Sequence, residues 1–399
     1  MRDQPGAGAG PARVRPEAAV PYTVAAEHVV TPDGVLTPGW LRVDGGRITE
    51  TGRGGAPGRP RFRGHWALPG FVDLHVHGGG GASFTEGGPD QARRAAAFHR
   101  AHGSTRIVAS LVTAPVAELE GRLALLAGLA GEGVIHGIHL EGPFLSAARC
   151  GAQDPRYLIP PDLAVFARLH AAAAGRLSVI TVAPELPGAL DVIRAAAAAG
   201  VIAAAGHTDA SAEVTAQAVT AGVSHATHLG NGMRPLGHRD PGPAGALLDR
   251  QVTCEVIADG VHLHDLTVRL VARAAGRENL VLITDAMAAA GMPDGRYRLG
   301  ALGVTVAGGV ARLDPGPGGI PGSIAGSTAT MDQIVRRAVT EVGLPVPDVA
   351  AAAATTPARR LGLAAETGAL RPGLAADLVL LDETYHLTAV IAAGSAVPA

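Results

Sequence analysis

Residues 69–81 read PGFVDLHVHGGGG, an apolar run that carries His75 and His77 just before four glycines. Residues i and i+2 of a β-strand point to the same face, so both imidazoles project from one side of a short strand. The glycines place no side chain between the end of that strand and a ligand. The stretch therefore predicts a strand that ends at a binding site.

Seven more apolar runs follow, separated by Ala-, Leu- and Arg-rich segments. The eight predicted strands are FVDLHVH, TRIVASLV, VIHGIHLE, LSVITVAPE, VIAAAGH, VSHATHL, VTCEVIA and LVLITDA. Short, largely apolar strands are typical of a parallel sheet that is buried on both faces. After the second strand, Leu119, Leu123 and Leu126 recur at helical spacing. Eight strand–helix units predict an α/β fold, a (β/α)8 TIM-like barrel over residues 67–360.

The two ends of the chain have a different pattern. Residues 1–20 are rich in Gly, Pro and Ala and predict a flexible tail. Residues 21–66 contain β-rich pieces separated by Asp-Gly and Gly-Gly turn signals, and residues 361–399 are β-like again. Neither segment could bury a sheet face alone, so we expect them to build one small β-sandwich domain together. The stretch YRLGALGVTVAGGVARLDPG predicts a β-hairpin inserted after the eighth strand.

The composition excludes several classes of protein. The chain has 33 basic and 35 acidic residues, which gives no excess positive charge for a nucleic-acid partner. It contains no apolar run of about 18 residues that predicts a membrane span, and its N-terminus lacks the apolar core of a signal peptide. Only Cys150 and Cys254 are present, too few for a disulfide framework. We therefore expect a cytoplasmic protein.

Polar residues stand at the ends of five predicted strands. In a barrel these ends meet at one mouth, where barrel enzymes hold their sites. A buried carboxylate or imidazole there costs several kcal/mol unless it is paired or bound to a metal. The His-x-His pair alone could equally be two solvated loop histidines, but the whole set predicts a metal centre. Its members are His75, His77, Glu141, His207, His228 and Asp285.

The residue types in this set indicate a catalytic metal. Glu141, His207 and His228 would form a three-ligand site that leaves a position for water. His75 and His77 would bind a second divalent ion beside it with Glu141 as a bridge, so we expect one or two ions per subunit. Imidazole and carboxylate ligands suit zinc, with iron, manganese or cobalt as alternatives. Asp285 suits a general base that accepts a proton from water and later delivers it to a leaving group.

The order of several motifs resembles a known family. They are PGFVDLHVHG, HLEGPF, GHTDA, THLGNGMRPLGHRDPG, ADGVH, TDA and AGS, in the order seen in N-acetylglucosamine-6-phosphate deacetylases of the amidohydrolase superfamily. The closing GALRPGLAADLVLLD is similar to that superfamily's sandwich domain. The resemblance extends over nearly everything after about residue 20. It implies hydrolysis of N-acetyl-D-glucosamine 6-phosphate to D-glucosamine 6-phosphate and acetate, in amino-sugar catabolism or recycling.

The resemblance also implies roles for individual residues. It makes Glu141, His207 and His228 the main metal ligands and Asp285 the acid/base. It implies a homodimer in which Arg239, in GHRDPG, reaches the phosphate in the neighbouring subunit's site. The residues implied in substrate binding are His262, Asn231, Gly232, Arg239, Gln153 and Ala152.

Two motifs supply substrate-binding residues, and one of them departs from the family's usual sequence. Asn231 and Gly232, in LGNGM, stand where the family binds phosphate. Gln153, in CGAQDP, stands where the family commonly has a histidine that contacts the substrate. A glutamine side chain can donate and accept hydrogen bonds but carries no charge.

Other functions make different demands on the sequence. A deacetylase of a related N-acetylhexosamine phosphate would share these motifs. A phosphosugar-binding protein without catalysis would not need Asp285 beside intact ligands, and a structural metal barrel would not need the glycines or Arg239. Hydantoinases and dihydroorotases resemble barrels in which a carboxylated lysine bridges two metals. All 33 basic residues here are arginines, so that variant is excluded.

Overall fold

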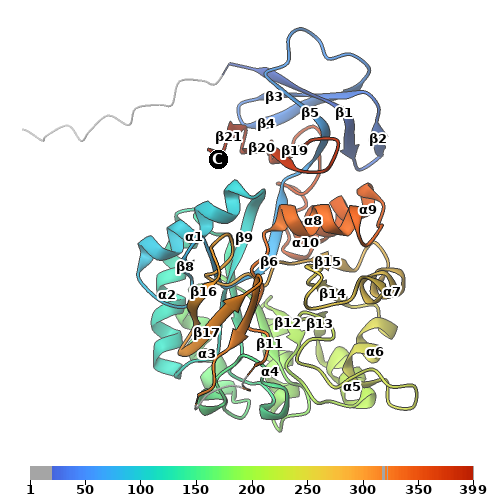
Figure 1. Ribbon diagram of the computed structural model, residues 1–399. Coiled ribbons are helices and arrows are strands. Elements are labelled where there is room, and N and C mark those ends of the chain that lie inside the picture. Colours follow the sequence, from blue (N-terminus) through green and yellow to red (C-terminus); the bar gives the residue numbers. More distant parts are fainter. Residues whose placement is uncertain (1–19, 317–319, 321, 399) are drawn as a thin grey trace, which may run out of the picture.

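The computed structural model describes residues 20–316, 320 and 322–398. The predicted tail, residues 1–20, lies outside these residues except for Val20. A ring of strands and helices carries a smaller β domain at one end (Figure 1).

The ring is an eight-stranded parallel barrel, as predicted from the eight apolar runs. Its strands are β6 (Phe71–Val76), β9 (Ser104–Leu111), β10 (Gly137–Glu141), β11 (Leu177–Val182), β12 (Ile202–Ala205), β13 (Val223–Ala226), β14 (Thr253–Val256) and β15 (Leu280–Leu282). Each strand pairs with the next one in chain order. The first and last strands meet just beyond β15, where Asp285 N donates to His75 O at 2.9 Å and Val76 forms a parallel bridge with Ala286. The barrel is thereby nearly closed.

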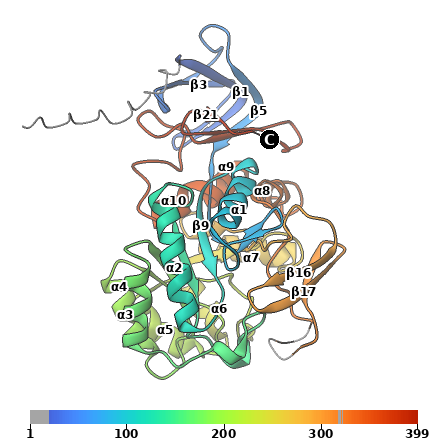
Figure 2. The same cartoon turned by 90° about the vertical axis from the view of Figure 1, so that its left-hand side faces the viewer.

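Helices cover the outside of the barrel (Figures 1 and 2). They are α1 (Pro89–Ala101), α2 (Val116–Gly131), α3 (Leu163–Ala172), α4 (Ala189–Ala198), α5 (Ala212–Ala221), α6 (Gly242–Asp249), α7 (Asp265–Ala275) and α8 (Met331–Thr340). On α2, the predicted face of Leu119, Leu123 and Leu126 is buried in the main core, which explains why the helix lies against the strands. In the described part of the chain, no helix has the length and apolar character needed to cross a bilayer.

The β domain is built from both chain ends, as predicted. Its strands are β1 (Tyr22–Thr31), β2 (Gly34–Leu36), β3 (Gly39–Asp44), β4 (Arg47–Arg53), β5 (Phe62–Pro69), β19 (Leu378–Leu381), β20 (Leu387–Ala392) and β21 (Ser395–Ala396). They form one sheet, in which the C-terminal β19 pairs with the N-terminal β5. Backbone bonds between Ile48 and the 373–374 segment, at 2.8 and 2.9 Å, curl this sheet around its own apolar core. Short helices α9 (Val346–Ala350) and α10 (Thr356–Arg360) lead the chain there from the barrel.

The segment after the eighth barrel strand is larger than the predicted hairpin. It is a three-stranded antiparallel sheet of β16 (Gly295–Leu299), β17 (Leu302–Ala307) and β18 (Val310–Leu313). A second tight turn forms at Gly308 and Gly309, whose φ angles of 58° and 74° suit glycine. This turn brings β18 back onto β17 and adds the third strand.

Candidate metal centre

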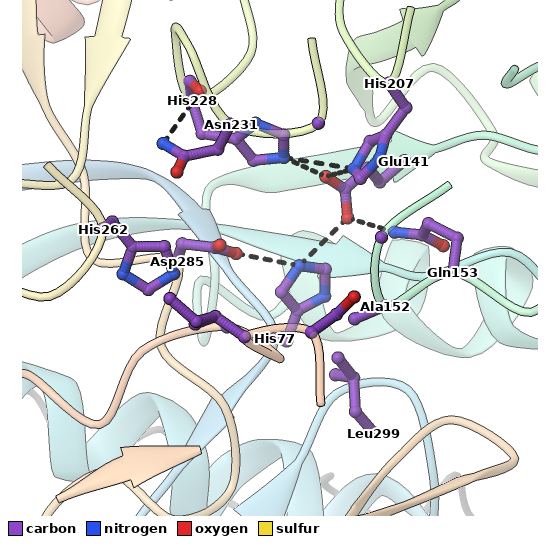
Figure 3. Close-up of a pocket in the computed structure, with 15 residues that line it drawn as sticks. His77, Glu141, Ala152, Gln153, His207, His228, Asn231, His262, Asp285 and Leu299 are labelled. Carbon is purple, nitrogen blue, oxygen red and sulfur yellow. Dashed lines mark hydrogen bonds and ion pairs between the residues drawn. The ribbon is translucent and has the colours of Figure 1, made fainter. Parts of the chain in front are cut away.

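A cavity of about 260 Å³ opens at the carboxyl ends of the barrel strands (Figure 3). His75 lies beneath it and is fully buried. Arg239 does not belong to the lining, because it is exposed on the loop between β13 and α6. All other residues predicted for the site line the cavity: His77, Glu141, Ala152, Gln153, His207, His228, Asn231, Gly232, His262 and Asp285.

Glu141, the last residue of β10, forms one donor cluster with two histidines. Its Oε1 lies 3.1 Å from His207 Nε2 and 2.9 Å from His228 Nε2, and these nitrogens are 3.2 Å apart. Ligand atoms bound to one tetrahedral zinc at about 2.0–2.2 Å would be about 3.4 Å apart. The three atoms therefore could hold one metal ion with little movement.

A second donor cluster lies beside the first. The Nε2 atoms of His75 and His77 are 3.0 Å apart, and Asp285 Oδ1 lies 3.3 Å and 3.2 Å from them. Glu141 Oε2 is 3.3 Å from His77 Nε2, so the Glu141 carboxylate lies between the two clusters (Figure 3). From the sequence, Asp285 is expected at the metal centre as the proton-transfer group and not as a ligand. Its position adds a third donor to the His75–His77 pair.

The orientation of the histidine rings fits a cation at the centre. Arg149 O can only accept a hydrogen bond, so His207 Nδ1, 3.0 Å away, must be the donor. This leaves the lone pair of His207 on Nε2, facing Glu141. His75 Nδ1 lies 3.3 Å from Glu255 Oε2 in a similar arrangement. Lone pairs of carboxylates and imidazoles that face one another are the donor set a divalent metal needs.

Three of these residues have an unusual backbone conformation. His207, His228 and Asp285 have φ angles of 46°, 28° and 50°, and each stands just beyond the end of its barrel strand. Non-glycine residues rarely adopt such angles, and those that do gather at functional sites. The turn at each strand end directs the side chain into the mouth of the barrel, which supports a functional role for all three.

Charges within the two clusters compensate one another. Burial opposes ionisation of Glu141 and Asp285, but the His75 imidazole and its neighbours hold both pKa values below their usual range. Burial likewise lowers the pKa of His75 and His77, yet Asp285 and Glu141 raise both above the usual histidine value. A divalent cation would supply the same compensation in place of the imidazolium protons.

The wall of the cavity contains further predicted residues. His262 Nδ1 lies 2.8 Å from Asp259 Oδ2. Burial lowers the pKa of His262, but this carboxylate raises it above its usual value, which favours the imidazolium form. Gly232 has a φ of 57°, and a Cβ there would lie 2.9 Å from His207 Nδ1. A side chain at this position would disturb the metal cluster.

Both polar atoms of the Gln153 side-chain amide form hydrogen bonds. Its Nε2 donates to Glu141 Oε2 at 2.6 Å, and its Oε1 accepts from Thr113 N at 2.8 Å. Gln153 therefore holds the carboxylate of Glu141 in place as well as lining the cavity.

Sequence reasoning missed two buried carboxylates beneath the site. Glu255 Oε2 accepts from His228 N at 3.2 Å and contacts His75, so it connects both clusters. Asp73 accepts from Thr284 Oγ1 at 2.6 Å and ties β6 to the segment after β15. Burial, opposed by the Thr284 bonds, raises the pKa of Asp73 to about 7. An acidic residue inside an apolar strand, as in VTCEVIA and FVDLHVH, was the signal that could have found both.

Known proteins resemble this chain in sequence and in structure. The sequence model that describes the amidohydrolase family matches residues 66–397. The N-acetylglucosamine-6-phosphate deacetylase of Bacillus subtilis is 34% identical over 383 residues, which cover 92% of this chain and 94% of the relative. The N-acetylgalactosamine-6-phosphate deacetylase of Escherichia coli O157:H7 is 36% identical over 324 residues, 80% of this chain and 84% of the relative.

A solved structure agrees with these relatives. N-acetyl-D-glucosamine-6-phosphate deacetylase from Mycobacterium smegmatis is 44% identical, with a TM-score of 0.90 over 94% of this chain and 100% of that chain. A mutant of that deacetylase, in complex with N-acetyl-D-glucosamine-6-phosphate, also superposes with a TM-score of 0.90.

Proposed function

The chain belongs to the amidohydrolase family, and from this we propose that it hydrolyses N-acetyl-D-glucosamine 6-phosphate to D-glucosamine 6-phosphate and acetate. The observation that carries the proposal is the pair of donor clusters joined by Glu141 at the floor of the cavity. A substrate in that cavity would present its amide to both clusters. Two N-acetylglucosamine-6-phosphate deacetylases, 34% and 44% identical over most of the chain, support this choice of reaction.

The residues at the floor of the cavity would have two roles in hydrolysis, metal binding and proton transfer. We assign Glu141, His207 and His228 to the main metal, with zinc favoured by the donor set and iron, manganese or cobalt as alternatives. When bound, such a metal polarises the amide carbonyl and lowers the pKa of water. Asp285 would accept the proton of the attacking water and deliver it to the nitrogen of the leaving amino sugar.

Other residues would bind and orient the substrate. His262, held by Asp259, would donate a hydrogen bond to the acetamide oxygen or a sugar hydroxyl. Asn231 and Gly232 would bind the phosphate, because Gly232 carries no side chain that could keep an anion from the backbone. Ala152 would form part of the wall around the sugar. For Gln153 we add a role in positioning Glu141 to the predicted contact with the substrate.

We further propose that the enzyme is a homodimer in which Arg239 reaches the neighbouring site. Arg239 is exposed and lies outside the cavity of its own chain, which supports this arrangement. Its planar guanidinium suits a phosphate dianion. We place the reaction in the cytoplasm, and the two cysteines, both free and buried, support that location.

The dimer proposal predicts complementation between two inactive variants. Asp285→Asn and Arg239→Ala subunits, each inactive alone, should recover part of the activity when mixed, because a mixed dimer contains one complete site. The measurement is acetate release after subunit exchange, with exchange itself followed by a mass tag. No recovery after proven exchange would place Arg239 outside the neighbouring site.

The second cluster predicts a separable metal position. The double substitution His75→Gln, His77→Asn should remove one ion, leave the main ion bound, and lower activity only in part, because Glu141, His207 and His228 remain. Metal content and acetate release of this variant should be measured beside the parent. Loss of both ions and all activity would show that the pair belongs to the main site.

The proposed reaction is tested by acetate release from four compounds. These are the 6-phosphates of N-acetylglucosamine and N-acetylgalactosamine and the two sugars without phosphate. We expect the glucosamine phosphate to be the best substrate. Preference for the galactosamine phosphate, the compound named for the Escherichia coli relative, would favour that alternative. Binding without acetate release by the metal-loaded protein would indicate a phosphosugar-binding protein.

A further inference from the structure

A second polar cavity, of about 270 Å³, lies at the opposite end of the barrel strands. Its basic residues come from four places: Arg100 near the end of α1, Arg106 early in β9, His136 just before β10 and Arg176 just before β11. Glu366, from the segment that leads to the β domain, also lines it. This is the side of the barrel on which the β domain lies (Figures 1 and 2).

The cavity is separate from the metal centre. His136 precedes β10 and Glu141 ends it, so the strand separates them by about 16 Å, at about 3.3 Å per residue. No residue is shared between the linings of the two cavities.

Positive charge in this second cavity is only partly balanced. Arg106 Nη2 pairs with Asp377 Oδ2 at 3.1 Å. The Asp377 carboxylate also accepts from Thr367 Oγ1 at 2.8 Å and from Ala393 N at 2.7 Å, so Arg106 shares it with two other donors. Arg100 Nη2 donates to Val134 O at 3.2 Å, a bond that carries no opposite charge. Among the described residues, neither Arg100 nor Arg176 forms an ion pair.

The basic groups also repel one another. Burial, followed by the charge of Arg106, lowers the pKa of Arg100. Burial and the charges of Arg106 and Arg176 lower the pKa of His136, against the opposing charge of Glu366. After burial, the next cause of both shifts is repulsion between cations that share the cavity. A bound anion would relieve this repulsion.

We propose that this cavity is a second anion site, which binds a phosphate group between the guanidinium groups of Arg100 and Arg176, with Arg106 and His136 beside them. Guanidinium groups match the oxygens of phosphate in geometry and charge. The volume lies just below the range of about 300–1,000 Å³ typical of pockets for larger organic ligands, so it suits a phosphate ion or the phosphate of a small metabolite. The lining includes Glu366, so the site lies where the barrel meets the segment that leads to the β domain.

Thermal unfolding of the metal-loaded, full-length protein tests the site. Inorganic phosphate should raise the midpoint by about 2 °C or more relative to chloride at equal ionic strength. The variant Arg100→Gln, Arg176→Gln should lose most of this rise and bind phosphate at least about tenfold more weakly at this site. The matched control is Arg63→Gln, Arg94→Gln, which removes two exposed arginines elsewhere and should keep the parent's response.

Counting bound phosphate separates this site from the proposed substrate site. Equilibrium dialysis should show one phosphate fewer per chain in the Arg100, Arg176 variant, while its acetate release stays close to that of the parent. The single change Arg176→Gln, at an exposed side chain, provides the same comparison if the double variant does not fold. Glucosamine 6-phosphate replaces inorganic phosphate in a parallel arm, to show whether the anion is free or carried by a sugar. Equal phosphate counts and equal midpoint shifts in parent and variant would overturn the proposal.

Discussion

Replacing Asp285 by Asn is expected to lower acetate release at least about a hundredfold, the usual scale of general acid–base catalysis. The amide of Asn cannot accept the proton of the attacking water or deliver it to the leaving nitrogen. The side chain keeps its size, so the fold and the main ion at Glu141, His207 and His228 should remain. The second ion should bind more weakly, because Asp285 Oδ1 lies 3.3 Å and 3.2 Å from the Nε2 atoms of His75 and His77.

The measurement is kcat and metal content at saturating metal, which separates proton transfer from loss of the second ion. The matched control is Asp191→Asn, at an exposed carboxylate on α4 that pairs with the exposed Arg194. This control should leave activity unchanged. Near-normal turnover of a folded, metal-loaded Asp285 variant would remove Asp285 from the proton-transfer role.

The barrel could be predicted because its evidence is local. Short apolar runs between helical patterns specify a parallel sheet, and parallel strands place all their carboxyl ends at one mouth. The polar residues at the ends of five of these runs therefore had to face one another. Glu141, His207, His228 and Asp285 could therefore be grouped from their positions in the sequence alone.

The connections beneath the mouth could not be predicted in the same way. Strand periodicity gives the face on which a side chain lies but does not give its partner across the barrel. Glu255 contacts His75, 180 positions away, and only the closed barrel brings them to 3.3 Å. Gln153 donates to Glu141 from an irregular loop, where the sequence has no strand or helix periodicity that would place the side chain. By contrast, the Asp259–His262 pair is local, and the ADGVH motif contains both partners.

The number of strands in the excursion after the barrel was also difficult to predict. A hairpin and a three-stranded sheet differ only in whether the Gly308–Gly309 turn returns the chain onto β17. The sequence AGGVARL permits both outcomes. Packing of Ala311 and Leu313 into the apolar cluster of this small sheet decides in favour of the third strand.

Replacing Glu141 by Gln is expected to remove the main ion and abolish acetate release. Oε1 of Glu141 lies 2.9 Å from His228 Nε2 and 3.1 Å from His207 Nε2. Gln has nearly the same shape but no negative charge, so the main site would keep only neutral donors, two imidazoles and a weakly binding amide oxygen. The affinity for the main metal should fall by more than the roughly 10- to 100-fold loss that follows removal of a group that only orients a ligand.

Glu141→Gln and the variant of His75 and His77 together determine how the two clusters depend on each other. Since Glu141 Oε2 also lies 3.3 Å from His77 Nε2, Glu141→Gln should weaken both ions, whereas the histidine variant should weaken only one. Metal content after dialysis and acetate release are measured for both, with circular dichroism to check the fold. The control is Glu118→Gln, at an exposed position on α2. Full occupancy of the main metal site in a folded Glu141→Gln variant would mean that the metal does not need the carboxylate. Glu141 would then no longer be assigned as a metal ligand.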